Sequence, residues 1–300
     1  MYNSNSIRKT VEQLTNNHNK AYPNIPLHER RIPSFLCLND IVNTIRSVIF
    51  PGYFDCSWIN ENSLVYHTGV AVEKLFNLLS QQIFDALVFE SQDLNSSETK
   101  EKASELTNIF LDKLPRIKEF MSSDVKAIFN SDPAAKNYGE IIFCYPAIKA
   151  ILNYRIAHEL FLLNIPILPR IISEMAHSET GIDIHPGAQI GEYFSIDHGT
   201  GIVIGQTTII GKNVTLYQGV TLGAKSFTLD EEGHPIDVPR HPILEDNVIV
   251  YSNSSILGRI TIGKGTVIGG NIWLTHSVPP NSKIVQTKAT ELCLTDGAGI

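Results

Sequence analysis

Several features that often direct a protein to a particular partner or compartment are missing from this 300-residue chain. Lysine and arginine form no block and the net charge is −7, which disfavours binding to nucleic acid or to an anionic membrane. There is no run of 18 apolar residues, and the polar start lacks the apolar core of a signal peptide. The four cysteines are scattered without CxxC spacing, which suits a reducing compartment. We therefore expect a cytoplasmic protein without a membrane span.

A ladder of aliphatic residues dominates the second half of the chain. From Ile184 to Leu274 an aliphatic residue recurs at almost every sixth position. A period of six residues fits neither an α-helix nor simple strand alternation. It is typical of a parallel β-helix built from hexapeptides, in which each short strand sends one aliphatic side chain inward. Glycine often follows the inward residue, and we expect it to give the corners their backbone freedom. The members of the ladder are Ile184, Ile190, Ile196, Ile204, Ile210, Leu216, Leu222, Leu244, Val250, Ile256, Ile262, Ile268 and Leu274.

The ladder is interrupted twice, and both interruptions carry histidines. Around Asp197 and His198 the step between inward residues is eight instead of six. The second break contains residues 224–239, which we expect to form a loop extruded from a corner of the coil. Function on repeat scaffolds tends to lie where the regular element is interrupted, so these two places are the candidate site.

The first 180 residues have the apolar spacing of helices. Apolar residues recur at intervals of three and four over 72–88 and again over 103–117, with Ser97 as the expected N-cap of the second run. A third helix is predicted to begin at Pro146, a residue suited to a first turn.

The predicted fold is therefore α+β with segregated domains. We expect a helical bundle over 1–180, a left-handed parallel β-helix over 181–286, and a flexible tail over 287–300. Packing and oligomerisation are the ordinary roles of such a bundle.

The spacing between Asp183 and His198 suggests a catalytic pair. One coil of three hexapeptides has about 18 residues and neighbouring coils stack about 4.8 Å apart, so residues 15 positions apart lie on neighbouring coils. A carboxylate that accepts a hydrogen bond from one ring nitrogen leaves the other nitrogen free to take a proton from a hydroxyl. The spacing alone is equally compatible with a corner histidine that is merely hydrogen-bonded to its surroundings.

An ordered set of motifs resembles serine O-acetyltransferases of the hexapeptide acyltransferase superfamily. The resemblance covers roughly residues 132–280, about half the chain. A generic hexapeptide acyltransferase would share the ladder but need not share the upstream aspartate motif. The motifs are Asp132-Pro133-Ala134-Ala135, Tyr154-Arg155-Ile156-Ala157-His158, Asp183-Ile184-His185-Pro186, Asp197-His198-Gly199-Thr200-Gly201, Gln218-Gly219-Val220-Thr221-Leu222-Gly223 and Arg240-His241-Pro242.

The resemblance implies transfer of acetyl from acetyl-CoA to the hydroxyl of L-serine, which gives O-acetylserine, the precursor of cysteine. In this resemblance His198 is the general base that deprotonates the serine hydroxyl, and Asp183 orients it.

The same resemblance assigns the ends of the zwitterionic substrate. Asp132 and Asp197 would receive the ammonium, and Arg240 would hold the carboxylate with His241 beside it. A guanidinium suits a planar carboxylate, and separated charges suit a zwitterion. Taken alone, Asp132 would be interpreted as a helix cap and Arg240 as a member of a surface ion pair.

Acetyl transfer builds negative charge on the thioester oxygen, so backbone N–H groups near Gly223 and Ala224 are expected to stabilise it. No cysteine lies between residues 181 and 286, which excludes an acetyl-cysteine intermediate on the β-helix and favours direct attack. Ser252 and Gly270 are the expected contacts to the rest of acetyl-CoA. Around Ala224 and Ser252, however, the sequence departs from the family's Gly-rich pattern.

The resemblance also implies partners. The superfamily typically packs three prisms together with sites between neighbours, so we expect a homotrimer, or a dimer of trimers joined by the helical domain. A terminal isoleucine such as Ile300 can enter the active site of O-acetylserine sulfhydrylase; the alternative is a disordered end. Inhibition by L-cysteine is a further expectation.

Other functions are weighed against this one. The closest alternative is acetylation of another small hydroxylated acceptor, such as homoserine or a sugar. A second is a zinc enzyme resembling the hexapeptide carbonic anhydrases, with His198, His234, His241 and His276 around the metal. These histidines do not have the anhydrase spacing, and we expect no metal. A third is a noncatalytic β-helix, which would not require the constellation around His198.

Overall fold

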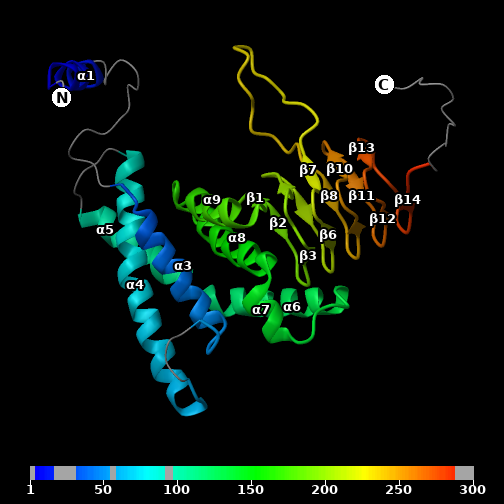
Figure 1. Cartoon of the computed structure of the whole chain (residues 1–300), viewed down its shortest axis with the longest axis horizontal. Coiled ribbons are helices and arrows are strands. Elements are labelled where there is room, and N and C mark those ends of the chain that lie inside the picture. Colours follow the sequence, from blue (N-terminus) through cyan, green and yellow to red (C-terminus); the bar gives the residue numbers. More distant parts are fainter. Residues whose placement is uncertain (1–3, 17–31, 55–58, 92–96, 288–300) are drawn as a thin grey trace.

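The computed structural model describes residues 4–16, 32–54, 59–91 and 97–287 (Figure 1). The predicted tail lies outside the described residues except for Thr287. The described helices are α1 (Ser4–Asn16), α3 (Phe35–Ile49), α4 (Glu61–Ser91), α5 (Ser97–Leu111), α6 (Leu114–Ser131), α7 (Tyr138–Cys144), α8 (Pro146–Leu162) and α9 (Leu168–Thr180). None of the helices in these ranges is long and apolar enough to cross a membrane.

Two of the predicted helices are confirmed, and one is wrong in part. Helix α4 covers the apolar run 72–88, and α8 begins at Pro146. The run 103–117 is split between α5 and α6 by a turn at Asp112 and Lys113. Proline has no N–H to donate and is tolerated only in the first turn of a helix, so Pro115 marks the start of α6.

The second half is a prism of three parallel sheets, as the ladder predicted. Sheet A has the strand order β1-β4-β7-β10-β13, sheet B β11-β8-β5-β2 and sheet C β14-β12-β9-β6-β3. All thirteen ladder residues point inward and are at most 7% exposed. The strands are β1 (Asp183–Ile184), β2 (Gln189–Ile190), β3 (Ser195–Asp197), β4 (Val203–Ile204), β5 (Ile209–Ile210), β6 (Thr215–Tyr217), β7 (Thr221–Gly223), β8 (Ile243–Leu244), β9 (Ile249–Val250), β10 (Ser255–Leu257), β11 (Thr261–Ile262), β12 (Val267–Ile268), β13 (Trp273–Leu274) and β14 (Lys283–Ile284).

The glycines that follow inward residues have a different role from the one expected. They do not adopt left-handed backbone; they allow neighbouring coils to approach. A Cβ on Gly191 would lie 2.7 Å from the carbonyl oxygen of Gly211, and a Cβ on Gly263 would lie 2.4 Å from the nitrogen of Pro280. The left-handed corner positions are filled equally often by asparagine, which tolerates this conformation, and by other glycines; examples are Asn213, Asn247 and Asn253, and Gly219, Gly258 and Gly265.

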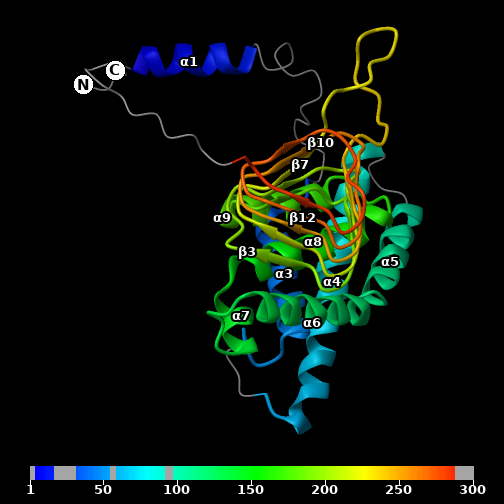
Figure 2. The ribbon, with the colours of Figure 1, turned by 90° about the vertical axis from the view of Figure 1, so that its right-hand side faces the viewer.

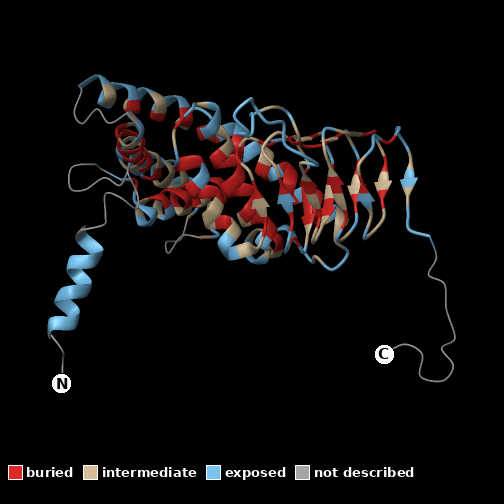
Figure 3. Cartoon of the chain, turned by 90° about the horizontal axis from the view of Figure 1, so that it is seen from above, coloured by how far each residue is buried: buried red, intermediate tan, exposed pale blue. Residues whose placement is uncertain are grey.

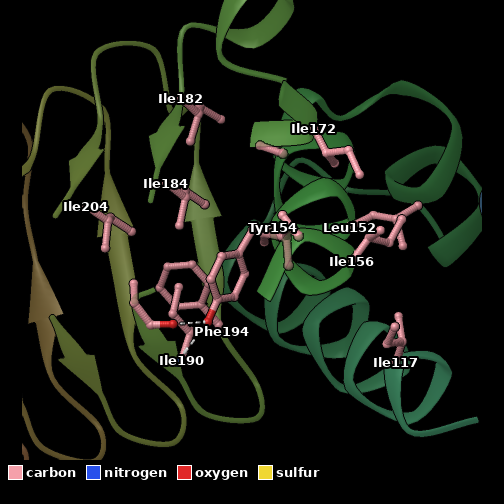
Figure 4. Packing of buried hydrophobic residues seen from close by; sticks show 14 of the residues in the cluster. Ile117, Leu152, Tyr154, Ile156, Ile172, Ile182, Ile184, Ile190, Phe194 and Ile204 are labelled. Carbon is pink, nitrogen blue, oxygen red and sulfur yellow. Dashed lines mark hydrogen bonds between the residues drawn. The ribbon is translucent and has the colours of Figure 1, made fainter. Parts of the chain in front are cut away.

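Helices α6, α8 and α9 cover the first coil of the prism (Figure 1). Tyr154 on α8 is fully buried there: its hydroxyl donates to the carbonyl of Ala188 at 2.6 Å and accepts from the N–H of Ile190 at 3.1 Å. Figure 4 shows its ring among the first-coil residues Ile184, Ile190 and Phe194. The buried apolar residues continue from the helices into the prism as one cluster, which Figure 3 shows as a continuous interior.

A buried ion pair strengthens the same junction. Arg155 on α8 and Asp124 on α6 are 5% and 0% exposed, with Nη2 and Oδ2 3.0 Å apart. Arg155 also donates to the carbonyls of Ile190 and Gly191, while Asp124 accepts from the N–H of Phe194. Burial raises the pKa of Asp124 to about 6, against the opposing effect of the guanidinium. Tyr154 and Arg155 of the Tyr154–His158 motif therefore bind the helical domain to the first coil, which is a structural role.

Candidate active site

Two corners of the prism carry the predicted site residues. The His198 corner joins sheet C to sheet A and contains residues 198–202, 218–220 and 251–254. The Arg240 corner joins sheet A to sheet B and contains residues 205–208 and 224–242. Figure 2, which looks along the prism, shows the loop 224–239 projecting from the Arg240 corner.

The eight-residue step in the ladder produces an outward bulge at the His198 corner. His198 and Gly199 both have left-handed backbone, with φ of 56° and 94°. Such a conformation is uncommon for a non-glycine residue and is often found at functional sites. The bulge leaves the imidazole 74% exposed, with Nε2 3.8 Å from Oδ1 of Asp197. His198 is therefore accessible to a substrate and adjacent to a carboxylate.

Asp132 approaches this corner from the helical domain. It is the C-cap of α6, and its carboxylate accepts from the N–H of Ala134 at 2.8 Å and from the hydroxyl of Tyr145 at 2.6 Å. These hydrogen bonds, with a smaller contribution from nearby His198, hold the pKa of Asp132 below its usual value. Two carboxylates, Asp132 and Asp197, thus lie near His198, and their binding of an ammonium stays a prediction.

A pair of tyrosines extends the His198 corner, and the sequence reasoning missed it. Strand β3 pairs with β6 so that Asp197 lies opposite Tyr217, and the rings of Tyr217 and Tyr251 stack with centroids 4.8 Å apart. Burial, followed by the charge of Asp197, raises the pKa of Tyr217. The signal was in the sequence, because all three residues directly follow an inward member of the ladder.

The predicted hydrogen bond between Asp183 and His198 is not formed in this structure. The Asp183 carboxylate instead faces α9, where it lies with Glu174 and His177 so that one ligand atom from each is within 4.8 Å of the others. The coil spacing placed Asp183 on the neighbouring coil but took no account of the helix that packs against β1 (Asp183–Ile184).

Arg240 is held rigidly at the second corner. Its guanidinium donates to Asp237 at 2.9 Å and to Oε1 of Gln206 at 2.8 Å, and its backbone N–H donates to the hydroxyl oxygen of Thr207 at 2.9 Å. The arginine side chain is 21% exposed. The ion pair that the sequence alone suggested is present, and the binding of a substrate carboxylate by Arg240 stays a prediction.

His241 is the buried support of this corner. It is 7% exposed, and its Nδ1 accepts from the N–H of Thr207 at 3.1 Å and lies 2.9 Å from the Thr207 hydroxyl. Burial, and then the charges of Arg240 and His185, lower the pKa of His241 to about 4. A neutral imidazole with Nδ1 as acceptor follows, so His241 positions the corner and is not poised to act as a base.

The two corners lie at opposite ends of the strands of sheet A within one chain. The chain runs from His198 through β4 (Val203–Ile204) before it reaches Thr207, the partner of Arg240. The four residues predicted to contact acetyl-CoA divide in the same way. Gly223 and Ala224 lie at the start of the Arg240 corner, whereas Ser252 and Gly270 adjoin each other at the His198 corner. One chain alone does not bring the predicted residues together.

The zinc alternative is not supported by the geometry. His198 and His241 lie at different corners, and His234 sits on the projecting loop near Asp230 and Glu232. Within 4–16, 32–54, 59–91 and 97–287, the group close enough to share a metal ion is the one formed by Glu174, His177 and Asp183, which includes none of the four histidines.

The prism of parallel sheets, the outward bulge that carries His198 and the extruded loop that precedes Arg240 together define a hexapeptide-repeat acyltransferase. A search against protein-family models gave no match. A plasmid-encoded serine acetyltransferase of Synechococcus elongatus is 47% identical over 90% of this chain and 86% of that protein. The serine acetyltransferase of Bacillus subtilis is 44% identical over 55% of this chain and 72% of that protein. This chain belongs to the serine acetyltransferase family.

Solved structures agree with this assignment. Serine acetyltransferase isoform 3 of Entamoeba histolytica, in complex with cysteine, superposes with a TM-score of 0.71, 26% identity and coverage of 96% of both chains. Serine acetyltransferase 1 of the same organism, in complex with L-cysteine, gives 0.71 at 30% identity over 94% of this chain and 100% of that chain.

Proposed function

We propose that this protein transfers acetyl from acetyl-CoA to the hydroxyl of L-serine, the activity for which its relatives are named. The observation that carries the proposal is the pair of carboxylates, Asp132 and Asp197, beside the exposed imidazole of His198. The carboxylates attract the ammonium of an amino acid, and this places the serine side chain within reach of His198.

His198 then acts as the general base. Its free ring nitrogen takes the proton of the serine hydroxyl while the oxygen attacks the thioester carbon. As the carbon–sulfur bond breaks, the imidazolium returns this proton to the sulfur, so that CoA leaves as the thiol. The backbone N–H groups at Gly223 and Ala224 are the proposed donors to the developing oxyanion, and Ser252 and Gly270 the proposed contacts along acetyl-CoA. We retain Asp183 as the residue that orients the imidazole.

That role requires two side chains to turn: the exposed ring of His198 away from Asp197, and the carboxylate of Asp183 away from Glu174 and His177. The two segments are neighbours, since a Cβ on Gly199 would lie 2.5 Å from Ile182, the residue before Asp183. An Asp183→Asn variant with unchanged kcat, beside an Asp197→Asn variant with reduced kcat, would assign the orienting role to Asp197 instead.

The complete site needs two chains. The His198 corner receives the ammonium and the hydroxyl, but the arginine for the carboxylate lies at the opposite ends of the strands of sheet A. In a closed ring of three prisms, the Arg240 corner of one protomer can face the His198 corner of the next. The projecting loop 224–239 supports this arrangement, because Phe227, Leu229 and Ile236 are exposed apolar side chains on a segment well placed to contact a neighbour. The proposed assembly is a homotrimer, alone or paired through the helical domain.

The direct test is release of CoA thiol by purified protein supplied with acetyl-CoA and a panel of acceptors. We expect L-serine to give by far the largest kcat/KM, and the His198→Ala variant to be nearly inactive. An equal or larger value for homoserine or for a sugar would replace serine as the acceptor. No serine-dependent thiol release would refute the proposed function.

Further expectations concern inhibition, partner and location. We propose that L-cysteine competes with serine, since it carries the same ammonium and carboxylate; an unchanged rate at high cysteine would contradict this. Ile300 lies outside the described residues, and its binding to O-acetylserine sulfhydrylase stays a prediction, to be tested by comparing the affinity before and after deletion of Ile300. We also propose a cytoplasmic enzyme, which fractionation of cells would test.

A further inference from the structure

The loop that carries Asp132 is tied to the prism directly beside the candidate site. Ser131, the last residue of α6, places its hydroxyl 2.9 Å from the hydroxyl of Ser195 on β3. Ser195 is 1% exposed and lies two residues before Asp197. This contact fixes the backbone next to Asp132 relative to the strand that carries the other carboxylate. It does not fix the direction in which the Asp132 side chain points.

Tyr145 supplies the missing constraint. Its hydroxyl donates to Oδ2 of Asp132 at 2.6 Å, while the N–H of Ala134 donates to Oδ1 at 2.8 Å. One hydrogen bond on each carboxylate oxygen sets the rotation of the whole group. Each oxygen accepts through one lone pair here, so both keep capacity for the N–H groups of an ammonium.

The backbone around Tyr145 makes it a firm anchor. Tyr145 is at once the C-cap of α7 and the N-cap of α8, and Pro146 occupies the first turn of α8. A residue between two helices has little freedom to move. The hydrogen bond to Asp132 and partial burial raise the pKa of Tyr145 to about 12, so the phenol remains a donor throughout the working pH range.

We propose that Tyr145 is a positioning residue for the amino-acid substrate, which holds the Asp132 carboxylate oriented toward the His198 corner so that it can receive the substrate ammonium. This inference rests on the proposed function. The hydrogen bond is already formed before substrate binds, so the carboxylate needs no reorientation when the ammonium arrives. Preorganisation of this kind strengthens ground-state and transition-state binding alike, which lowers KM and leaves kcat nearly unchanged.

The test compares Tyr145→Phe with a matched tyrosine substitution. Tyr138→Phe is the control, because Tyr138 is an exposed tyrosine on α7 that packs on Phe129 and makes no hydrogen bond through its hydroxyl to the described residues. For Tyr145→Phe we expect KM for serine to rise roughly 10-fold, the typical effect of losing a hydrogen bond to a charged group. We expect kcat and KM for acetyl-CoA to change less than about twofold. Tyr138→Phe should leave all three constants unchanged.

A double-mutant cycle with Asp132→Ala separates positioning from a general structural effect. If Tyr145 acts through Asp132, Tyr145→Phe should raise KM for serine in the presence of Asp132 and have no further effect in its absence. An unchanged KM in Tyr145→Phe would overturn the inference. The same increase with and without Asp132, or a parallel loss of kcat and of acetyl-CoA affinity, would also overturn it. Absence of serine-dependent activity in the wild-type protein would refute the proposed function itself, which is a separate outcome.

Discussion

Substituting Gly205 by alanine should damage the Arg240 corner through one buried contact. A Cβ on Gly205 would lie 2.0 Å from Cδ2 and 2.1 Å from Nε2 of His241. The backbone of Gly205 is not left-handed, so alanine meets no conformational obstacle. The whole effect therefore comes from the ring of His241, which must move by more than about 1 Å to reach ordinary contact distance.

Displacing the ring of His241 has two energetic costs. Inserting a methyl group into a packed interior costs about 1–3 kcal/mol. The displaced His241 also loses the hydrogen bonding that the N–H and hydroxyl of Thr207 share on the single lone pair of Nδ1, together worth about 1 kcal/mol. We expect Gly205→Ala to lower the free energy of unfolding by about 2–4 kcal/mol in total. Because Thr207 also holds the backbone of Arg240, KM for serine should rise as well.

Chemical denaturation and steady-state kinetics measure the two effects. The control is the same substitution in a His241→Ala background, where the space that the new methyl group needs is already empty. There Gly205→Ala should cost less than about 1 kcal/mol. An equal cost with and without the imidazole would show that the glycine is required for a reason other than the His241 ring.

The remaining predictions concern the base, the domain junction and pH. His198→Ala should lower kcat by about 10² to 10⁴-fold, and wild-type turnover in the purified variant would exclude His198 as the base. Arg155→Ala should lower the free energy of unfolding by about 3–5 kcal/mol, since it leaves Asp124 buried without its cation, and the double variant with Asp124→Ala should lose less than the sum of the two single losses. The low pKa of His241 means that the folded state favours the neutral ring. Its stabilisation is complete above pH 6.5 and is lost as the pH falls from 6.5 toward 4, by up to about 3 kcal/mol. His241→Gln should therefore lose less stability than wild type over that pH interval. Equal pH dependence of the free energy of unfolding in the two proteins would contradict the lowered pKa of His241.

The interior of the prism could be predicted from sequence because one physical requirement repeats along the chain. Each strand must bury one aliphatic side chain, so residues such as Ile184 and Leu274 reveal the coil directly. The same repetition places Asp197, Tyr217 and Tyr251 in one outward row. The role of the glycines that follow inward residues was predicted wrongly. Glycine is favoured both by left-handed backbone and by close contact between coils, and the sequence does not distinguish these two causes. The structure does, because a Cβ on Gly191 would collide with the backbone of the next coil.

The contacts between elements could not be predicted in this way. The hydrogen bond from Tyr145 to Asp132 spans a loop and a short helix, and no periodic pattern connects the two residues. The expected pair of Asp183 and His198 followed from coil spacing and from the family resemblance, neither of which shows that the packing of α9 brings Glu174 and His177 to the same carboxylate. The proposed sharing of a site between Arg240 of one chain and His198 of the next depends on assembly, and no repeat within a single chain predicts it.

The most direct test of the account is subunit complementation between His198→Ala and Arg240→Ala. Each variant alone should be nearly inactive. In trimers mixed at equal ratio, a site with an intact His198 from one protomer and an intact Arg240 from the next forms at about one interface in four, so we predict about a quarter of wild-type activity. If both residues acted within one chain, every chain in the mixture would carry a defective site. No recovery of activity in demonstrably mixed trimers would contradict the account.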